Sequence, residues 1–329
     1  MTNRREFISL IASAAAYPVT ALADQNQPML TVGVLTGNIE TDPLAQARVG
    51  AFRSALAELG WGERDVRLEV RWPGPDIARQ ERDARELVAM GLDVILTTST
   101  SATRAVRDAT NTIPVVFVGL ADPVASGIVS NLARPDGNVT GFMLYKHSLS
   151  GKWLGLLKEI APQTTDISIL FNPETAPYAP SYIQYAQEMS ERLAVRVTTA
   201  SVRQAADIAP AIQRIAGSGM GGVLVLPDGG FIASNIAAIT ALTAECRVPT
   251  IYSVKSYVVS GGLMSYSADL TNQFREGASY VDRVLRGTQP NDLPVQFATK
   301  FDLVINLKVA DALGLAVPNS LLLDADLIE

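Results

Sequence analysis

The sequence has very little of the two residue types on which many catalytic and metal sites depend. Among its 329 residues there is one cysteine, Cys246, and one histidine, His147. A single cysteine excludes an intrachain disulfide and a thiolate metal cluster. A single histidine excludes most zinc-hydrolase sites and leaves any histidine-based mechanism to one side chain. The sequence also contains no Walker loop and no Gly-x-Ser-x-Gly elbow, which mark nucleotide-binding and hydrolytic enzymes.

Charged residues are also scarce, and basic residues do not dominate. Charged residues make up 18% of the chain and hydrophobic residues 48%, a composition that excludes general disorder. The chain has 27 Lys and Arg against 33 Asp and Glu, a net charge of −6. We therefore expect no nucleic-acid partner, since such binders normally present a basic surface. At roughly 100–200 residues per domain, the length indicates two lobes.

The first 23 residues have the layout of an export signal. Two arginines at positions 4 and 5 precede an apolar, alanine-rich stretch from residue 7 to about residue 16, and residues 21–23 (ALA) form a small-x-small cleavage signal. The apolar stretch is too short to span a bilayer, which takes about 20 residues. Residues 3–8 (NRREFI) resemble the twin-arginine export motif, although Asn3 stands where Ser or Thr is usual, so the twin-arginine and Sec routes both stay open. We expect a periplasmic protein whose signal is cleaved near Ala23.

Short apolar runs alternate with helical patterns along most of the chain. In the first half, strands are predicted at 31–36, 66–72, 93–97 and 115–120, with helices at about 49–59, 76–90 and 101–109. In the second half, helices at 148–160, 182–193, 205–216 and 231–245 alternate with strands at 167–171, 195–200, 223–226, 250–252 and 263–266. A helix at 272–286, extended segments within 293–303 and a short helix at 306–313 follow. Strands separated by helices of this length indicate βαβ units and parallel sheets.

The two halves align loosely with each other. Pro114 and Pro249 each open a predicted strand and lie 135 positions apart, and the strands containing Gly33 and Ile169 are offset by 136. This near-constant offset favours two similar lobes over one large sheet. We predict an α/β fold of two Rossmann-like lobes with parallel sheets joined by hinge crossovers. The first lobe would comprise 24–144 plus about 271–293, and the second 145–270 plus about 294–329.

Polar residues follow the ends of the predicted strands, where ligands bind in open parallel sheets. The candidates in the first lobe are Gly37, Asn38, Thr98, Ser99, Thr100 and Asp122. The candidates in the second lobe are Asn172, Asp228 and Tyr252. Tyr252, Tyr145 and Tyr266 could provide flat walls to a pocket, although tyrosines more commonly pack in a core or interface. No pair of residues suggests a nucleophile with its base.

The run at residues 97–101 (TTSTS) is the most informative of these segments. Five small hydroxyl residues precede a predicted helix, whose unpaired N–H groups and dipole favour an anion. Helix capping would explain one such residue. Five in a row exceed that need, so we predict contact with a carboxylate or similar acceptor.

Asp228 occupies the matching loop of the second lobe, across the expected cleft. An acidic residue there suits an ammonium or hydroxyl group of a ligand. The alternative is a capping or turn aspartate before Gly229 and Gly230. The sequence does not separate these two roles.

Several segments together resemble the substrate-binding proteins of ABC transporters, in the group that includes tryptophan and tyrosine binders. The matching segments are 113–117 (IPVVF), 122–124 (DPV), 137–142 (GNVTGF), 149–152 (LSGK), 171–173 (FNP), 261–266 (GGLMSY), 293–295 (LPV) and, most distinctive, 299–308 (TKFDLVINLK). The resemblance covers nearly the whole chain after the signal. It implies the type I periplasmic binding protein fold, no enzymatic activity, no cofactor, a monomer, and delivery of a small solute to an ABC permease in the inner membrane.

The resemblance implies an aromatic amino acid or related carboxylate as the solute. The chain departs from such relatives in having Asp228-Gly229 where they tend to show Asp-Asn, and in having Ser267 where Gly is frequent. Two other readings stay open: a ligand sensor that presents its solute to a receptor, and an exported two-lobe Rossmann-like enzyme.

Overall fold

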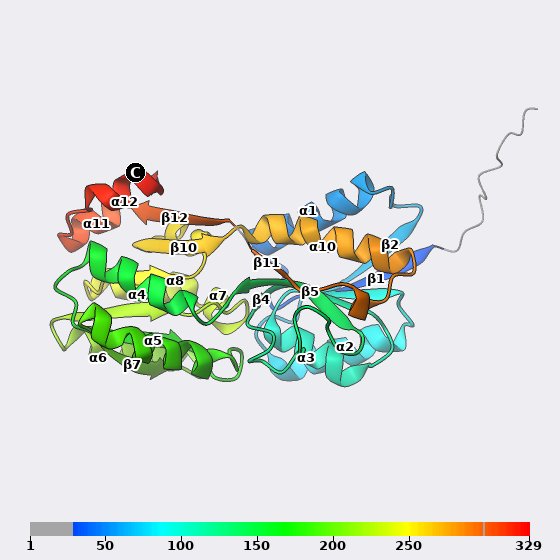
Figure 1. Ribbon diagram of the computed structural model, residues 1–329, viewed down its shortest axis with the longest axis horizontal. Helices are drawn as coiled ribbons and strands as arrows, with labels where there is room; N and C mark the ends of the chain where they lie inside the picture. Colours follow the sequence, from blue (N-terminus) through cyan, green and yellow to red (C-terminus); the bar gives the residue numbers. More distant parts are fainter. Residues whose placement is uncertain (1–28, 299) are drawn as a thin grey trace, which may run out of the picture.

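The computed structural model describes residues 29–298 and 300–329, which form two lobes built on separate sheets (Figure 1). The predicted signal peptide, including its twin-arginine segment, lies outside the described residues. Within the described part, no helix is long and apolar enough to cross a bilayer.

The first lobe contains a six-stranded parallel sheet in the order β11-β5-β4-β3-β1-β2. Its strands are β1 (Leu30–Leu35), β2 (Val66–Arg71), β3 (Val94–Thr97), β4 (Val115–Ala121), β5 (Val139–Tyr145) and β11 (Gln296–Phe297). Its helices are α1 (Pro43–Glu58), α2 (Ile77–Ala89), α3 (Thr100–Ala109), α10 (Leu270–Leu285) and the 3₁₀ turn η2 (Pro290–Asp292). Helices α1 and α10 pack together on one face of the sheet, and α2 and α3 on the other (Figure 1). This cover explains why β3 and β4 are apolar without alternation.

The second lobe contains a seven-stranded sheet in the order β13-β12-β10-β9-β8-β6-β7. Its strands are β6 (Asp166–Phe171), β7 (Arg196–Ser201), β8 (Gly221–Val225), β9 (Thr250–Tyr252), β10 (Met264–Ala268), β12 (Phe301–Asn306) and β13 (Ala325–Ile328). Its helices are α4 (Leu149–Ile160), α5 (Ala179–Leu193), η1 (Ala205–Asp207), α6 (Ile208–Ala216), α7 (Phe231–Ser234), α8 (Ile236–Glu245), α9 (Lys255–Val259), α11 (Leu307–Leu313) and α12 (Asn319–Asp324). Only the β10–β12 pair of this sheet is antiparallel.

The apolar faces expected from the sequence form the core. Val49, Phe52 and Leu56 of α1 are buried against Phe274 and Val281 of α10. Fully burying one such side chain contributes about 1.5–3 kcal/mol, so this seam fixes α10 to the first lobe although it follows a strand of the second. The predicted α/β arrangement of two lobes with parallel sheets is confirmed.

The chain passes between the lobes three times, in the segments after β5, after β10 and after β11 (Figure 1). Because β11 pairs with β5, the last return to the second lobe comes after Phe297, later than the boundary near residue 293 that the sequence suggested. A two-residue strand has no periodicity from which it could be recognised.

Two elements differ from the sequence-based expectation. The helix predicted at 231–245 is broken into α7 and α8 at Asn235, whose side-chain amide donates to the Phe231 carbonyl (2.8 Å) and competes with the helical pattern. Strand β5 was not foreseen. It pairs with β4, whose register shifts between Val118 and Ala121. Gly141 of β5 has a positive φ, and a Cβ there would overlap the backbone of Phe117 in β4.

Candidate functional site

A cavity of about 350 Å³ lies between the two lobes, at the carboxyl ends of their parallel strands. This is the position where open α/β sheets bind ligands, and its size falls within the range of small-molecule pockets. The polar side chains that the first lobe contributes are Asn38, Asp42, Arg48, Thr98, Ser99 and Thr100. Those of the second lobe are Thr175, Tyr178, Asp228, Ser256, Tyr257 and Ser260.

The lobes touch each other at the edge of this cavity. A methyl group added to Gly37 of the first lobe would lie 3.2 Å from the carbonyl oxygen of Gly229 in the second. One added to Gly229 would lie 3.6 Å from the carbonyl oxygen of Thr98. Gly37 also has no room on its own side, because the same methyl would lie 2.7 Å from Ser99 Oγ. The absence of a side chain at Gly37 therefore lets the loops of the two lobes meet, whereas a methyl group at Gly229 would make ordinary van der Waals contacts.

The five hydroxyl residues at 97–101 divide into two kinds. Thr97 Oγ1 bonds to Thr103 Oγ1 (2.7 Å), and Ser99 Oγ caps α3 by accepting from the Ala102 N–H (3.2 Å), with Ser101 Oγ 3.3 Å away. Thr98 and Thr100 are 9% and 5% exposed, line the cavity, and have no side-chain hydrogen bond among the described residues. Capping therefore accounts for part of the run, while two hydroxyls and the N-terminus of α3 face the cavity.

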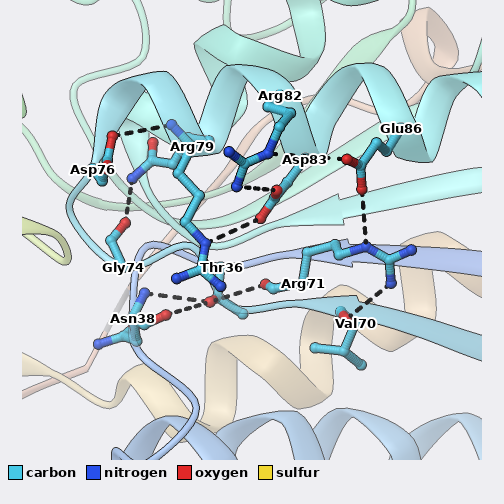
Figure 2. Close-up of polar contacts among 11 residues, drawn as sticks. Thr36, Asn38, Val70, Arg71, Gly74, Asp76, Arg79, Arg82, Asp83 and Glu86 are labelled. Carbon is cyan, nitrogen blue, oxygen red and sulfur yellow. Dashed lines mark hydrogen bonds and ion pairs between the residues drawn. The ribbon is translucent and has the colours of Figure 1, made fainter.

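Asn38 is held in place by the turn that follows β1. The Thr36 hydroxyl donates to the carbonyls of Asn38 (3.0 Å) and Arg71 (3.3 Å) and accepts from the Asn38 N–H (3.3 Å), as Figure 2 shows. The Asn38 side-chain amide donates to Asp42 Oδ2 (3.0 Å). Asn38 thus lines the cavity with one of its two amide N–H groups bonded to Asp42.

Asp228 is buried in the second lobe and lines the cavity. Its Oδ2 accepts from the Thr175 hydroxyl (2.5 Å) and the Ile232 N–H (3.3 Å), and its Oδ1 accepts from the Gly230 N–H (2.8 Å). Burial raises the pKa of the Asp228 carboxyl above its ordinary value, and these hydrogen bonds partly oppose the rise. The Phe231 backbone N–H also stabilises the charged form of this carboxyl, so groups of the second lobe largely surround it. Asp228 thus acts as a turn aspartate and also lines the cavity, and its contact with a ligand group stays a prediction.

Aromatic side chains of the cavity come from positions that the sequence did not single out. Tyr178 and Tyr257 of the second lobe and Phe274 of α10 line it. The two tyrosine hydroxyls donate to backbone carbonyls, Tyr178 to Pro227 and Tyr257 to Asp228 (3.3 Å). These hydrogen bonds hold the two rings in place at the wall of the cavity.

Two predicted residues lie outside the cavity lining because their side chains shape neighbouring turns. Asp122, with a φ of +41°, accepts from the Ala125 N–H (3.0 Å) and pairs with His147 Nδ1 (2.9 Å) beside the first crossover. Asn172 Oδ1 accepts from the N–H groups of Glu174 (2.8 Å) and Thr175 (3.2 Å). Asn172 thus positions Thr175, which does line the cavity.

The three tyrosines predicted as possible pocket walls are also absent from the cavity lining. Tyr145 is buried, and its hydroxyl donates to the Ser253 carbonyl. Tyr252 is fully buried beneath α8, and its hydroxyl lies 3.0 Å from Thr243 Oγ1. Tyr266 stacks on Phe301 with ring centroids 5.4 Å apart. All three tyrosines therefore pack within the protein, as tyrosines commonly do.

Arg48 of α1 is a cavity residue that the sequence interpretation missed. It stands in an ordinary helical pattern next to Val49, and no local signal distinguishes it from the arginines on the outer surface. Arg48 becomes a cavity residue only because the second lobe lies opposite the start of α1 in the folded protein.

Comparison with known proteins settles the family. The model of the ABC transporter substrate-binding proteins matches residues 31–328. The chain belongs to this family. Such a protein is the non-enzymatic, extracytoplasmic solute-binding component of an ABC transporter, which confirms the role that the sequence resemblance implied.

Individual relatives agree with this assignment. A tyrosine-binding protein of Clostridioides difficile (strain R20291) is 25% identical over 285 residues, which cover 85% of this chain and 81% of the relative. A conserved domain protein from Vibrio cholerae is 28% identical with a TM-score of 0.85, and an ABC domain in complex with L-Trp from Streptococcus pneumonia is 25% identical with a TM-score of 0.82. Both structures are covered completely and match 92% of this substrate-binding protein. Solved structures at 11–13% identity, with TM-scores of 0.55–0.62, share the two-lobed type I periplasmic binding protein fold.

Proposed function

We propose that this substrate-binding protein captures an aromatic amino acid or a related carboxylate between its lobes and delivers it to an ABC permease. The observation that carries the proposal is the interlobe cavity, which both lobes line with polar groups. The names of two relatives support the solute class, since one is a tyrosine-binding protein and the other holds L-Trp.

The solute carboxylate would bind at the N-terminus of α3. Thr98 and Thr100 offer two buried hydroxyls, and the first N–H groups of the helix lack helical partners. Hydrogen bonds to a charged acceptor contribute about 1.5–3 kcal/mol each. Among the hydroxyl groups of the first lobe, those of Thr98 and Thr100 therefore form the strongest site for a carboxylate.

The solute ammonium would bind to Asp228, the acidic residue of the second lobe that lines the cavity. Tyr178, Tyr257 and Phe274 would flank the body of the solute. A ligand that contacts both lobes stabilises the closed arrangement, and one that contacts a single lobe does not.

We further propose that the protein works as a monomer in the periplasm, exported by the N-terminal signal. The permease partner in the inner membrane follows from the transporter family and the solute-binding role.

A thermal-shift screen of refolded, ligand-stripped protein tests the proposal. The panel contains amino acids, aromatic acids and small sugars. A binder at 100 times its Kd adds about 2.7 kcal/mol to stability, so at least one aromatic amino acid or related carboxylate should raise the Tm by several degrees. Stabilisation by a sugar and by no carboxylate would contradict the assigned solute class.

A further inference from the structure

Arg48 approaches the cavity from a different side than the hydroxyls of α3. It lies on α1, which covers the same face of the first-lobe sheet as α10, whereas Thr100 opens α3 on the opposite face (Figure 1). Both side chains line the one cavity. The first lobe therefore offers two positively polarised contacts to the cavity: Arg48 from one face of the sheet and the N-terminus of α3 from the other.

The acidic groups near Arg48 are already engaged elsewhere. Asp42 caps α1 by accepting from the N–H groups of Leu44 (2.9 Å) and Ala45 (3.2 Å) and also accepts from Asn38. Asp269 caps α10 by accepting from the Asn272 N–H (3.0 Å).

In the described chain, the Arg48 guanidinium has neither an ion pair nor a hydrogen bond to any of these acidic groups. Arg48 also makes no ion pair or hydrogen bond with Asp228, which accepts its hydrogen bonds from groups of its own lobe. Three charged side chains line the cavity. Asp42 and Asp228 both accept hydrogen bonds, whereas the Arg48 guanidinium makes no hydrogen bond and no ion pair with the described residues.

The surroundings of the guanidinium are poorly suited to an unpaired charge. Burial lowers the pKa of Arg48 from its ordinary value, and the nearby Asp42 and Asp269 carboxylates partly oppose this shift. Pro43, Leu44 and Phe274 line the same cavity. A guanidinium stays charged and presents a planar fork of donors that matches a carboxylate with two parallel bonds. A partly buried, unpaired fork that faces a cavity is a site for an anion.

We propose that the solute carries a second anionic group, most simply a second carboxylate, which Arg48 binds while α3 holds the first. This inference rests on the proposed function and narrows its solute class. The solute would be a dicarboxylate with an apolar or aromatic body, with or without an α-ammonium group. The solute of this protein would then differ from tyrosine and tryptophan, which relatives bind, at the end opposite the carboxylate held by α3.

Matched pairs of probes that differ by one carboxylate provide the test. The pairs are L-phenylalanine and 4-carboxy-L-phenylalanine, 3-phenylpropionate and 3-(4-carboxyphenyl)propionate, and hexanoate and adipate. Calorimetry on ligand-stripped protein gives Kd for each. In at least one pair the dicarboxylate should bind tenfold or more tightly than its partner.

Three variants assign the effect to Arg48. Arg48→Gln should remove the advantage of the dicarboxylate, so that the dicarboxylate loses at least tenfold more affinity than its monocarboxylate partner. Arg48→Lys should keep part of the advantage, because it keeps the charge and loses the fork. Arg53→Gln is the matched control, since Arg53 is an exposed arginine of the same helix outside this cavity, and it should keep the whole advantage. The Tm of each ligand-free variant reports on folding separately.

The outcomes separate the inference from the proposed function. Equal or tighter binding of the monocarboxylate in every pair would overturn the inference alone, as would an equal loss for both members of a pair in Arg48→Gln. Failure of every probe here and of every carboxylate in the wider screen would overturn the proposed function together with the inference.

Discussion

Replacing Asp228 by asparagine tests the second-lobe half of the site most sharply. Asparagine keeps the shape of the side chain and an acceptor for the Gly230 N–H, and removes the negative charge that the solute ammonium would meet. A charge-assisted hydrogen bond contributes about 1.5–3 kcal/mol, which corresponds to a roughly 10- to 150-fold weaker Kd.

The same change has a structural cost that must be kept apart from binding. The Ile232 N–H would face an amide nitrogen in place of Asp228 Oδ2, and the Thr175 hydroxyl would have to turn and accept instead of donate. Losing one buried hydrogen bond costs about 1 kcal/mol of stability. This lowers the Tm of the ligand-free protein by a few degrees without unfolding it.

Calorimetry with the amino acid found in the thermal-shift screen measures the effect at a temperature well below the Tm of the variant. Asp324→Asn is the matched control, because Asp324 is an exposed aspartate of α12 in the same lobe. An unchanged Kd in Asp228→Asn, or an equal loss in both variants, would remove Asp228 from the site and leave it the role of a turn aspartate.

Three further predictions concern the first lobe and the pH dependence. Thr98→Val and Thr100→Val should each weaken carboxylate binding about tenfold with little change in Tm, because neither hydroxyl has a partner in the described protein; calorimetry with the carboxylate and with its primary amide checks this, and an equal loss for the amide would speak against a carboxylate contact. Gly37→Ala should weaken binding, since the added methyl would lie 2.7 Å from Ser99 Oγ and disturb the α3 cap and the lobe contact; a wild-type Kd would show that the loop adjusts freely. Because burial raises the pKa of Asp228 in the folded state, its contribution to the free energy of unfolding falls as the pH rises from the ordinary carboxyl value through the raised one. In urea titrations of ligand-free protein, the stability of Asp228→Asn relative to wild type should therefore increase across that window, and a constant difference would refute the assigned shift.

The fold followed from local patterns in the sequence because the patterns and the packing agree. Buried strands such as β3 are continuous apolar runs, and the face of α1 with Val49 and Phe52 is the face that packs. The position of the cavity at the carboxyl ends of the strands follows from parallel topology alone. Thr98, Ser99, Thr100, Asn38 and Asp228 could be placed at its edge for that reason.

The rest of the site depends on distances between elements, which no local pattern records. Tyr252 and Tyr257 are five residues apart, yet Tyr252 points into the core below α8 and Tyr257 lines the cavity from the start of α9. Arg48 is one of several arginines in its region, and only the contact of the lobes brings it to the cavity. The short strand β11 is defined entirely by its partner β5.

The central claim is that one solute bridges two lobes, and a crystal structure of the protein with the solute identified by screening tests it most directly. The account predicts density for an unmodified molecule in the cavity, with its carboxylate within hydrogen-bonding distance of Thr98 or Thr100 and its donor group within that distance of Asp228. Density for the solute outside this cavity, or in contact with one lobe only, would contradict it.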